Sequence, residues 1–192
     1  LQSIITTIIA AVTAFGPLLL QLAPSAFEAK EEDILLNMSV ISDTHLDAAF
    51  SPLAWFLGFG LDDMAGAKTP VDVVAVTGDL TNYGDEASID EFFDTMQKHW
   101  DGKAVISMGN HDIGHVEDKT HEEARQYFVQ KINEYQNLGI EKSYYSTVIN
   151  GYTFIVIASE GTSTSAYISP EQLQWLREEM DKAAEKELPI FV

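Results

Sequence analysis

Three polar clusters, each placed directly after a short apolar run, contain the residues of this chain that are best suited to chemistry. The clusters are Asp43-Thr44-His45, Gly78-Asp79 and Gly109-Asn110-His111-Asp112. Their carboxylate, imidazole and amide groups are ligands for hard or borderline metal ions, and the chain has no cysteine that could offer a soft thiolate. The pattern therefore predicts a metal site and excludes thiol chemistry.

The order of the clusters indicates a two-metal site for phosphoester hydrolysis. Such a site holds its cations about 3.5 to 4 Å apart, and a carboxylate with two oxygens can bridge them. Asp79 is the candidate bridge, while Asp43 and His45 are predicted to turn toward the first metal from one loop. Asn110 is predicted to offer its amide oxygen to the second metal. His111 then remains free to act on the substrate, and it is the candidate catalytic residue.

The runs before the clusters are short and rich in β-branched residues, as expected of strands that are covered on both faces. They span residues 35–42, 71–77 and 104–108. In open α/β sheets, ligands gather at the carboxyl ends of the strands, so the three clusters are expected to converge. The other expected elements are helices at 86–100 and 119–136, a helix that begins at Ser169-Pro170, and a hairpin of 144–149 and 152–158 around Asn150-Gly151. This order fits a mixed sheet flanked by helices.

With these motifs the chain resembles the calcineurin-like metallophosphoesterases, and in particular the bacterial branch related to class III cyclic-nucleotide phosphodiesterases. The resemblance covers Leu35 to Val192. Its three motifs, Asp43-Thr44-His45, Gly78-Asp79-Leu80-Thr81-Asn82 and Gly109-Asn110-His111-Asp112, match the first three blocks of the family in order and approximate spacing.

The resemblance implies an α/β fold, the metallo-dependent phosphatase-like four-layer αββα sandwich. It implies hydrolysis of a small phosphomonoester or phosphodiester by metal-activated hydroxide, with two divalent or trivalent metal ions drawn from Mn, Fe or Zn. It also implies that Asp43 and His45 ligate one metal, that Asp79 bridges, and that Asn110 ligates the other metal. His111 is then the acid near the leaving group.

The chain departs from the family pattern at its ends. Two further histidine blocks of the family are missing, and the chain stops at Pro189-Ile190-Phe191-Val192, which is typical of the start of a strand. We therefore expect residues 30–192 to be the N-terminal part of the domain, with an incomplete metal shell and no activity on its own. The alternative is a noncatalytic fragment or a degenerate surface binding module.

The N-terminal segment and the net charge bear on location and partners. Residues 1–27 carry no charged side chain, and residues 4–22 form a nearly continuous apolar stretch. A signal peptide or membrane anchor over 1–29, in an extracytoplasmic protein, is favoured over a buried core helix. The formal net charge of −19 argues against nonspecific binding to nucleic acid.

Several residues have two interpretations at the level of the sequence. Asp112 is expected either to orient His111 or to cap the following turn, and Asn82 either to line the pocket or to form a turn. His115 is more readily explained as a solvated loop residue than as a contact to the substrate. The aromatic segment 46–70 either touches a membrane or roofs the site, or forms a short helix at the sheet edge, which is slightly favoured.

Overall fold

The computed structural model describes residues 33–50, 52–114 and 120–192. The chain divides into two units, residues 1–35 and residues 36–192, and every helix and strand named below belongs to the second unit.

Two expectations lie outside the described residues: the signal peptide or anchor at 1–29 and the role of His115. Within the part of the chain that the structure describes, no helix has the length and apolar character needed to cross a membrane.

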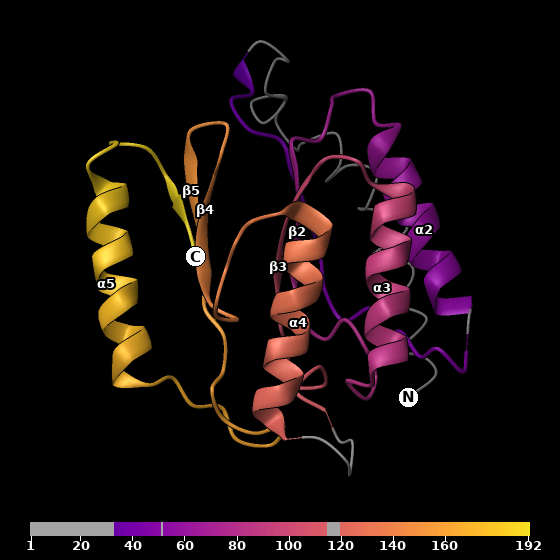
Figure 1. The fold of residues 1–192 in the computed structure, drawn as a ribbon. Helices are drawn as coiled ribbons and strands as arrows, with labels where there is room; N and C mark the ends of the chain where they lie inside the picture. The colour runs from indigo at the N-terminus through magenta and orange to yellow at the C-terminus, as the bar shows by residue number, and fades with distance from the viewer. Residues whose placement is uncertain (1–32, 51, 115–119) are drawn as a thin grey trace, which may run out of the picture. The chain divides into compact units, whose positions relative to one another are not determined.

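The strands form two sheets (Figure 1). They are β1 (Met38–Ile41), β2 (Val73–Thr77), β3 (Lys103–Ser107), β4 (Tyr145–Ile149), β5 (Tyr152–Val156) and β6 (Ile190–Phe191). The first sheet is parallel, in the order β1-β2-β3, and in the second sheet β4 is antiparallel and β6 parallel to β5. Asn150 and Gly151 join the hairpin with φ angles of 51° and 87°, which a type I′ turn requires at both positions.

The last three helices that the structure describes begin where the sequence supplies side chains that satisfy free backbone N–H groups. They are α2 (Pro52–Ala65), α3 (Glu86–His99), α4 (His121–Gln136) and α5 (Pro170–Ala184). The side chain of Asp85 accepts from Ser88 N at the start of α3, and Ser169 accepts from Gln172 N at the start of α5. Thr120 and Glu123 form a reciprocal capping box at the start of α4.

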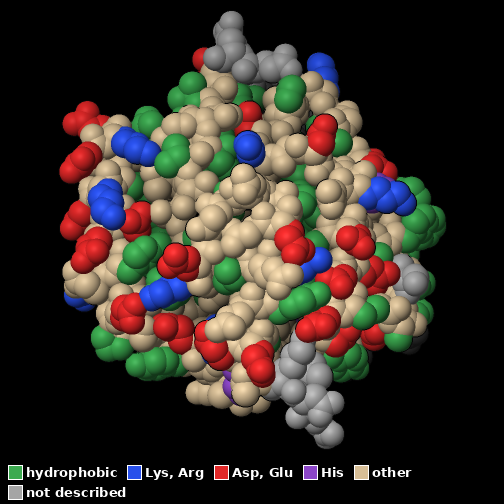
Figure 2. Space-filling model, in the orientation of Figure 1, with side chains coloured by type: hydrophobic (Ala, Val, Ile, Leu, Met, Phe, Trp, Pro, Cys, Tyr) green, Lys and Arg blue, Asp and Glu red, His purple; other side chains and the backbone are tan. Residues whose placement is uncertain are grey.

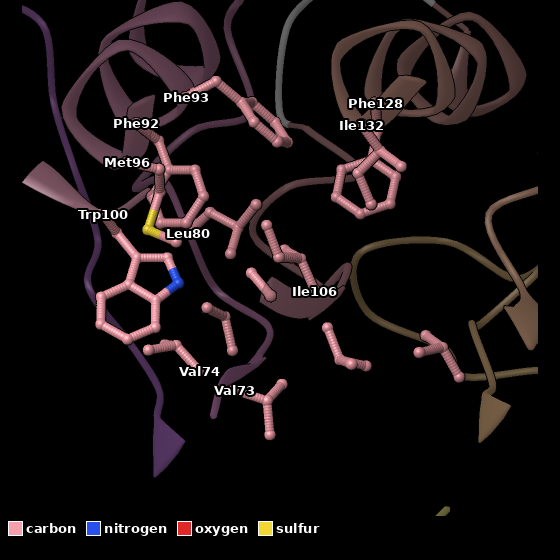
Figure 3. Close-up of a cluster of buried hydrophobic side chains, with 14 of the residues drawn as sticks. Val73, Val74, Leu80, Phe92, Phe93, Met96, Trp100, Ile106, Phe128 and Ile132 are labelled. Carbon is pink, nitrogen blue, oxygen red and sulfur yellow. The ribbon is translucent and has the colours of Figure 1, made fainter. Parts of the chain in front are cut away.

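The unit of residues 36–192 has four layers. α5 contacts β5, β5 contacts β3 of the parallel sheet, and α4 contacts β3, while α3 packs between α4 and α2 (Figure 1). Helices thus lie on the outer faces of two sheets, which is the α/β sandwich that the family resemblance implies. The buried core joins Val73, Val74 and Ile106 of the parallel sheet to Phe92 of α3 and Phe128 of α4 (Figure 3).

The segment 46–70 contains α2, so the expectation of a short helix is confirmed for residues 52–65. The helix packs against α3, and its residues Leu57 and Leu61 belong to the buried core. Trp55, Phe56 and Phe59 remain exposed. Because apolar residues occur on several faces of α2, hydrophobic periodicity alone is a weak signal for this helix.

Side chains, rather than another strand, close the outer edge of β3. The hydroxyl of Tyr145 accepts from Ile106 N (2.9 Å) and donates to Ile106 O (3.0 Å). Gln136 does the same for Ala104: its amide oxygen accepts from Ala104 N (3.2 Å) and its amide nitrogen donates to Ala104 O (2.8 Å). These groups satisfy backbone donors and acceptors that a strand edge otherwise leaves unpaired.

We expect Tyr145→Phe to lower the free energy of unfolding by about 1–3 kcal/mol, because it leaves the buried N–H and C=O of Ile106 without a partner. Urea denaturation of the two proteins measures this loss. Tyr167→Phe is the matched control, since Tyr167 is 54% exposed. Equal effects of the two substitutions would contradict the role given to Tyr145.

Candidate metal centre

The three polar clusters converge at the carboxyl end of the parallel sheet, as predicted. Backbone hydrogen bonds join the loop after β1 to the loop after β2: Asp43 N donates to Gly78 O (3.2 Å) and His45 N donates to Asp79 O (3.0 Å). The loop after β3 joins them, because His111 N donates to Asp79 Oδ1 (3.0 Å). Residues from three separate parts of the sequence thus lie together at the carboxyl ends of the three strands.

The backbone of these loops adopts conformations that non-glycine residues rarely take. Asp43, His45 and Asp79 have φ angles of 55°, 45° and 51°. Residues held in this left-handed region cost of order 1–3 kcal/mol each, and they concentrate at functional sites. These turns bring Asp43 Oδ1 to 3.6 Å from His45 Nε2, so the two side chains lie close enough to bind one metal ion.

Two glycines permit the close approach of the loops. Gly78 has a φ of 96°, and a Cβ at this position would lie 2.8 Å from Gly109 N. A Cβ at Gly109 would lie 2.0 Å from Asp79 Oδ1. Any larger residue at 109 would therefore displace the Asp79 carboxylate.

His45, Asp79 and His111 form a compact group of potential metal ligands. One donor atom from each residue lies within 4.8 Å of the donor atoms of the other two. The two imidazole rings meet edge to face, with their centroids 4.6 Å apart. Nδ1 of His45 is buried and has no hydrogen-bond partner, a condition that a bound cation would relieve. These observations fit a centre for borderline metals that prefer nitrogen and oxygen ligands.

A backbone carbonyl orients the ring of His111. Its Nδ1 lies 2.8 Å from Asn82 O, so Nδ1 carries the proton and donates it to the carbonyl. Nε2 is then the ring nitrogen without the proton, which is the form in which a neutral imidazole ligates a metal. Asn82 therefore contributes through its main chain, and a contact of this kind leaves no signal in residue types.

Residues 37–192 match the family model of the calcineurin-like phosphoesterases. This chain belongs to the calcineurin-like phosphoesterase family. The family typically depends on two metal ions, and the group formed by His45, Asp79 and His111 is chemically suited to such a centre.

Other comparisons add little to this assignment. A comparison with curated proteins finds no significant match. Among solved structures, the cold-active protein-tyrosine phosphatase of a psychrophilic Shewanella species is 17% identical, with 81% of this chain covered and a TM-score of 0.30. The chain spans about half of that protein, 51% of its length.

Within this calcineurin-like phosphoesterase, the other two predicted ligands lie at the margin of the group. Asp43 is exposed, lies beside His45, and accepts a hydrogen bond from the hydroxyl of Ser42. Asn110 is exposed in the turn that also carries His111. The donor group itself therefore combines two predicted metal ligands, His45 and Asp79, with the predicted catalytic residue His111.

Asp112 is buried beneath these loops, and its carboxylate accepts hydrogen bonds from both of them. The donors are Gly109 N, Leu80 N, Thr81 N and the hydroxyl of Thr81. Burial raises the pKa of Asp112, and the hydrogen bonds from Gly109, Thr81 and Leu80 oppose that rise. Sequence reasoning considered only local roles for this residue and missed its contact with the loop after β2.

We expect Gly109→Ala to abolish metal binding, because the added methyl group would occupy the position of the Asp79 carboxylate. Elemental analysis of the purified protein after loading with Mn²⁺ measures the bound metal, and circular dichroism checks the fold. Gly60→Ala in α2 is the control, since no heavy atom lies within 4 Å of its added Cβ. A full metal complement in Gly109→Ala would show that Asp79 is not required where the structure holds it.

Proposed function

We propose that this chain supplies the first motifs of a two-metal phosphoesterase that hydrolyses a small phosphomonoester or phosphodiester. The observation that carries the proposal is the group of His45, Asp79 and His111 at the carboxyl end of the parallel sheet, in a member of this family. Bound Mn, Fe or Zn ions would neutralise phosphate oxygens and activate water there.

We assign the roles of the residues from their chemistry and position. Asp79 bridges the two metals, Asp43 and His45 hold the first, and Asn110 holds the second. The 3.6 Å approach of Asp43 to His45 supports the first pair, and the shared turn of Asn110 and His111 supports the placement of Asn110. His111 donates a proton near the leaving group, and its bond to Asn82 O, which fixes the ring, supports this role.

We further propose that the enzyme belongs to the branch related to class III cyclic-nucleotide phosphodiesterases, and that donors beyond these residues complete its metal shell. A phosphoesterase centre of two metals needs more ligands than the group assembled here provides. The noncatalytic alternative, a surface binding module, does not account for three donor side chains held together, two of them, His45 and Asp79, on strained backbone.

The charge and the N-terminal sequence support proposals on substrate and location. Acidic side chains are spread over the face drawn in Figure 2, and the chain has 30 Asp and Glu against 11 Lys and Arg. This balance favours a small substrate recruited by the metals over a nucleic-acid polymer. The uncharged, apolar residues 4–22 support export or membrane attachment.

The full-length protein loaded with Mn²⁺ is expected to hydrolyse a generic aryl phosphodiester or phosphomonoester, and chelation is expected to abolish turnover. A spectrophotometric assay for the released phenol follows the reaction. Residues 31–192 alone are expected to lack activity, because their metal shell is incomplete. The absence of metal-dependent hydrolysis by the full-length protein across a broad phosphoester panel would refute the hydrolase.

Two substitutions separate metal binding from proton transfer. Asp79→Asn removes the bridging charge and is expected to lose both metals. His111→Asn is expected to keep the metals and to slow turnover by roughly 10²- to 10⁴-fold, the usual contribution of general acid catalysis. Metal analysis of both variants and their kcat values measure the difference. Equal loss of metal would instead place His111 among the ligands, which its position in the donor group also permits.

A further inference from the structure

We propose that Asp112 is a positioning residue for the metal centre: its buried carboxylate fixes the loop after β2 against the loop after β3, and so sets the spacing of the donors on the two loops. The inference rests on the proposed function, since it concerns the same centre. Asp112 itself is not a member of the donor group, so it acts through the residues that it holds.

The hydrogen bonds of Asp112 divide evenly between its two oxygens. Oδ2 accepts from Leu80 N (3.1 Å) and from Gly109 N (2.8 Å), and therefore bridges the two loops directly. Oδ1 accepts from Thr81 N (2.8 Å) and from the Thr81 hydroxyl (3.0 Å). The bonds from Leu80 and Thr81 are buried, since Asp112 is 1% and both Leu80 and Thr81 are 0% exposed, and the bond from Gly109 is partly buried.

The bonded residues are direct neighbours of the proposed ligands. Leu80 follows Asp79 in the chain, and Gly109 precedes Asn110. Movement of the backbone at Leu80 or Gly109 would therefore move the adjacent donor side chain. The two loops also contact each other directly, because His111 N donates to the Asp79 carboxylate. The carboxylate of Asp112 therefore controls how far apart the two loops carry their ligands.

Only a carboxylate can satisfy this arrangement. An asparagine at position 112 has one accepting oxygen and one donating amide group. In either orientation its amide hydrogens would face a backbone N–H, from Leu80 and Gly109 on one side or from Thr81 on the other. The isosteric substitution Asp112→Asn thus keeps the shape of the side chain and separates the loops by repulsion between donors.

In the described part of the chain, no cationic side chain lies against the buried carboxylate of Asp112. Among the residues that the structure describes, Asp112 is the buried carboxylate, and no ion pair with a lysine, arginine or histidine reaches it. A buried charge is costly unless an opposite charge compensates it. The four hydrogen bonds from the two loops offset that cost, and a movement that separates the loops would remove them.

The test compares Asp112→Asn with Gln172→Met in the full-length protein. Gln172 is also fully buried and also satisfies a backbone, through Ala158 N (2.9 Å) and Ala158 O (2.8 Å), but it lies on α5. Both variants are expected to unfold at lower temperature than the wild type. Only Asp112→Asn is expected to bind Mn²⁺ more weakly, by about 10- to 100-fold, as is usual when a residue that supports metal ligands is replaced.

Binding is measured by competition with a chelating dye, at a temperature where all variants are folded by circular dichroism. A second pair of variants tests the same contact with less disturbance. Thr81→Val removes one of the donors to Asp112 and is expected to weaken Mn²⁺ binding, whereas Thr81→Ser keeps the hydroxyl and is expected to bind as the wild type does. Amide hydrogen exchange at Leu80 and Gly109 is expected to be faster in Asp112→Asn than in Gln172→Met.

Wild-type Mn²⁺ affinity in Asp112→Asn, together with a loss of thermal stability like that of Gln172→Met, would overturn the inference and leave Asp112 a purely structural residue. Equal Mn²⁺ affinities of Thr81→Val and Thr81→Ser would also count against it. A wild-type protein that binds Mn²⁺ and hydrolyses no phosphoester would count against the hydrolase alone, because the affinity comparison would still decide the role of Asp112.

Discussion

Parallel pairing of β1, β2 and β3 in one register is the constraint on which the metal centre depends. Ile41 pairs with Val76, and Thr77 pairs with Ser107, so the three strands end at nearly the same level of the sheet. The polar clusters begin within a few residues of those ends. A shift of one residue in either pairing would turn the side chains of that strand to the opposite face and move its cluster away from the others.

In the loops that follow the strands, hydrogen bonds offset the strain of unfavourable backbone conformations. Three non-glycine residues adopt left-handed backbone conformations, which an isolated loop would relax. Backbone hydrogen bonds between the loops and the carboxylate of Asp112 offset that strain. The same bonds hold the loop that carries Asp43 and His45 against the loop that carries Asp79, so a cation bound there would depend on the same contacts. Stability and metal affinity are therefore coupled in this part of the molecule.

The sequence predicts the elements and the convergence of the site better than it predicts the contacts that support them. Apolar runs with β-branched residues, Asn150-Gly151 and the helix start at Ser169-Pro170 are local signals, and the structure has the corresponding strands, turn and helix. The carbonyl of Asn82, the carboxylate of Asp112 and the hydroxyl of Tyr145 act on residues distant in the chain. Their partners are decided by tertiary structure, so residue type and spacing give no indication of them.

The closure of β3 by side chains has a consequence for the order of events during synthesis. Gln136 and Tyr145 lie 32 and 39 residues beyond the backbone groups that they satisfy. A nascent chain that has just completed β3 therefore presents an open strand edge until both residues have left the ribosome. Contacts of such long range form slowly, and an open edge can pair with another chain in the meantime. During this interval the growing polypeptide can misassemble with another chain. The risk ends when the hairpin of β4 and β5 docks against β3.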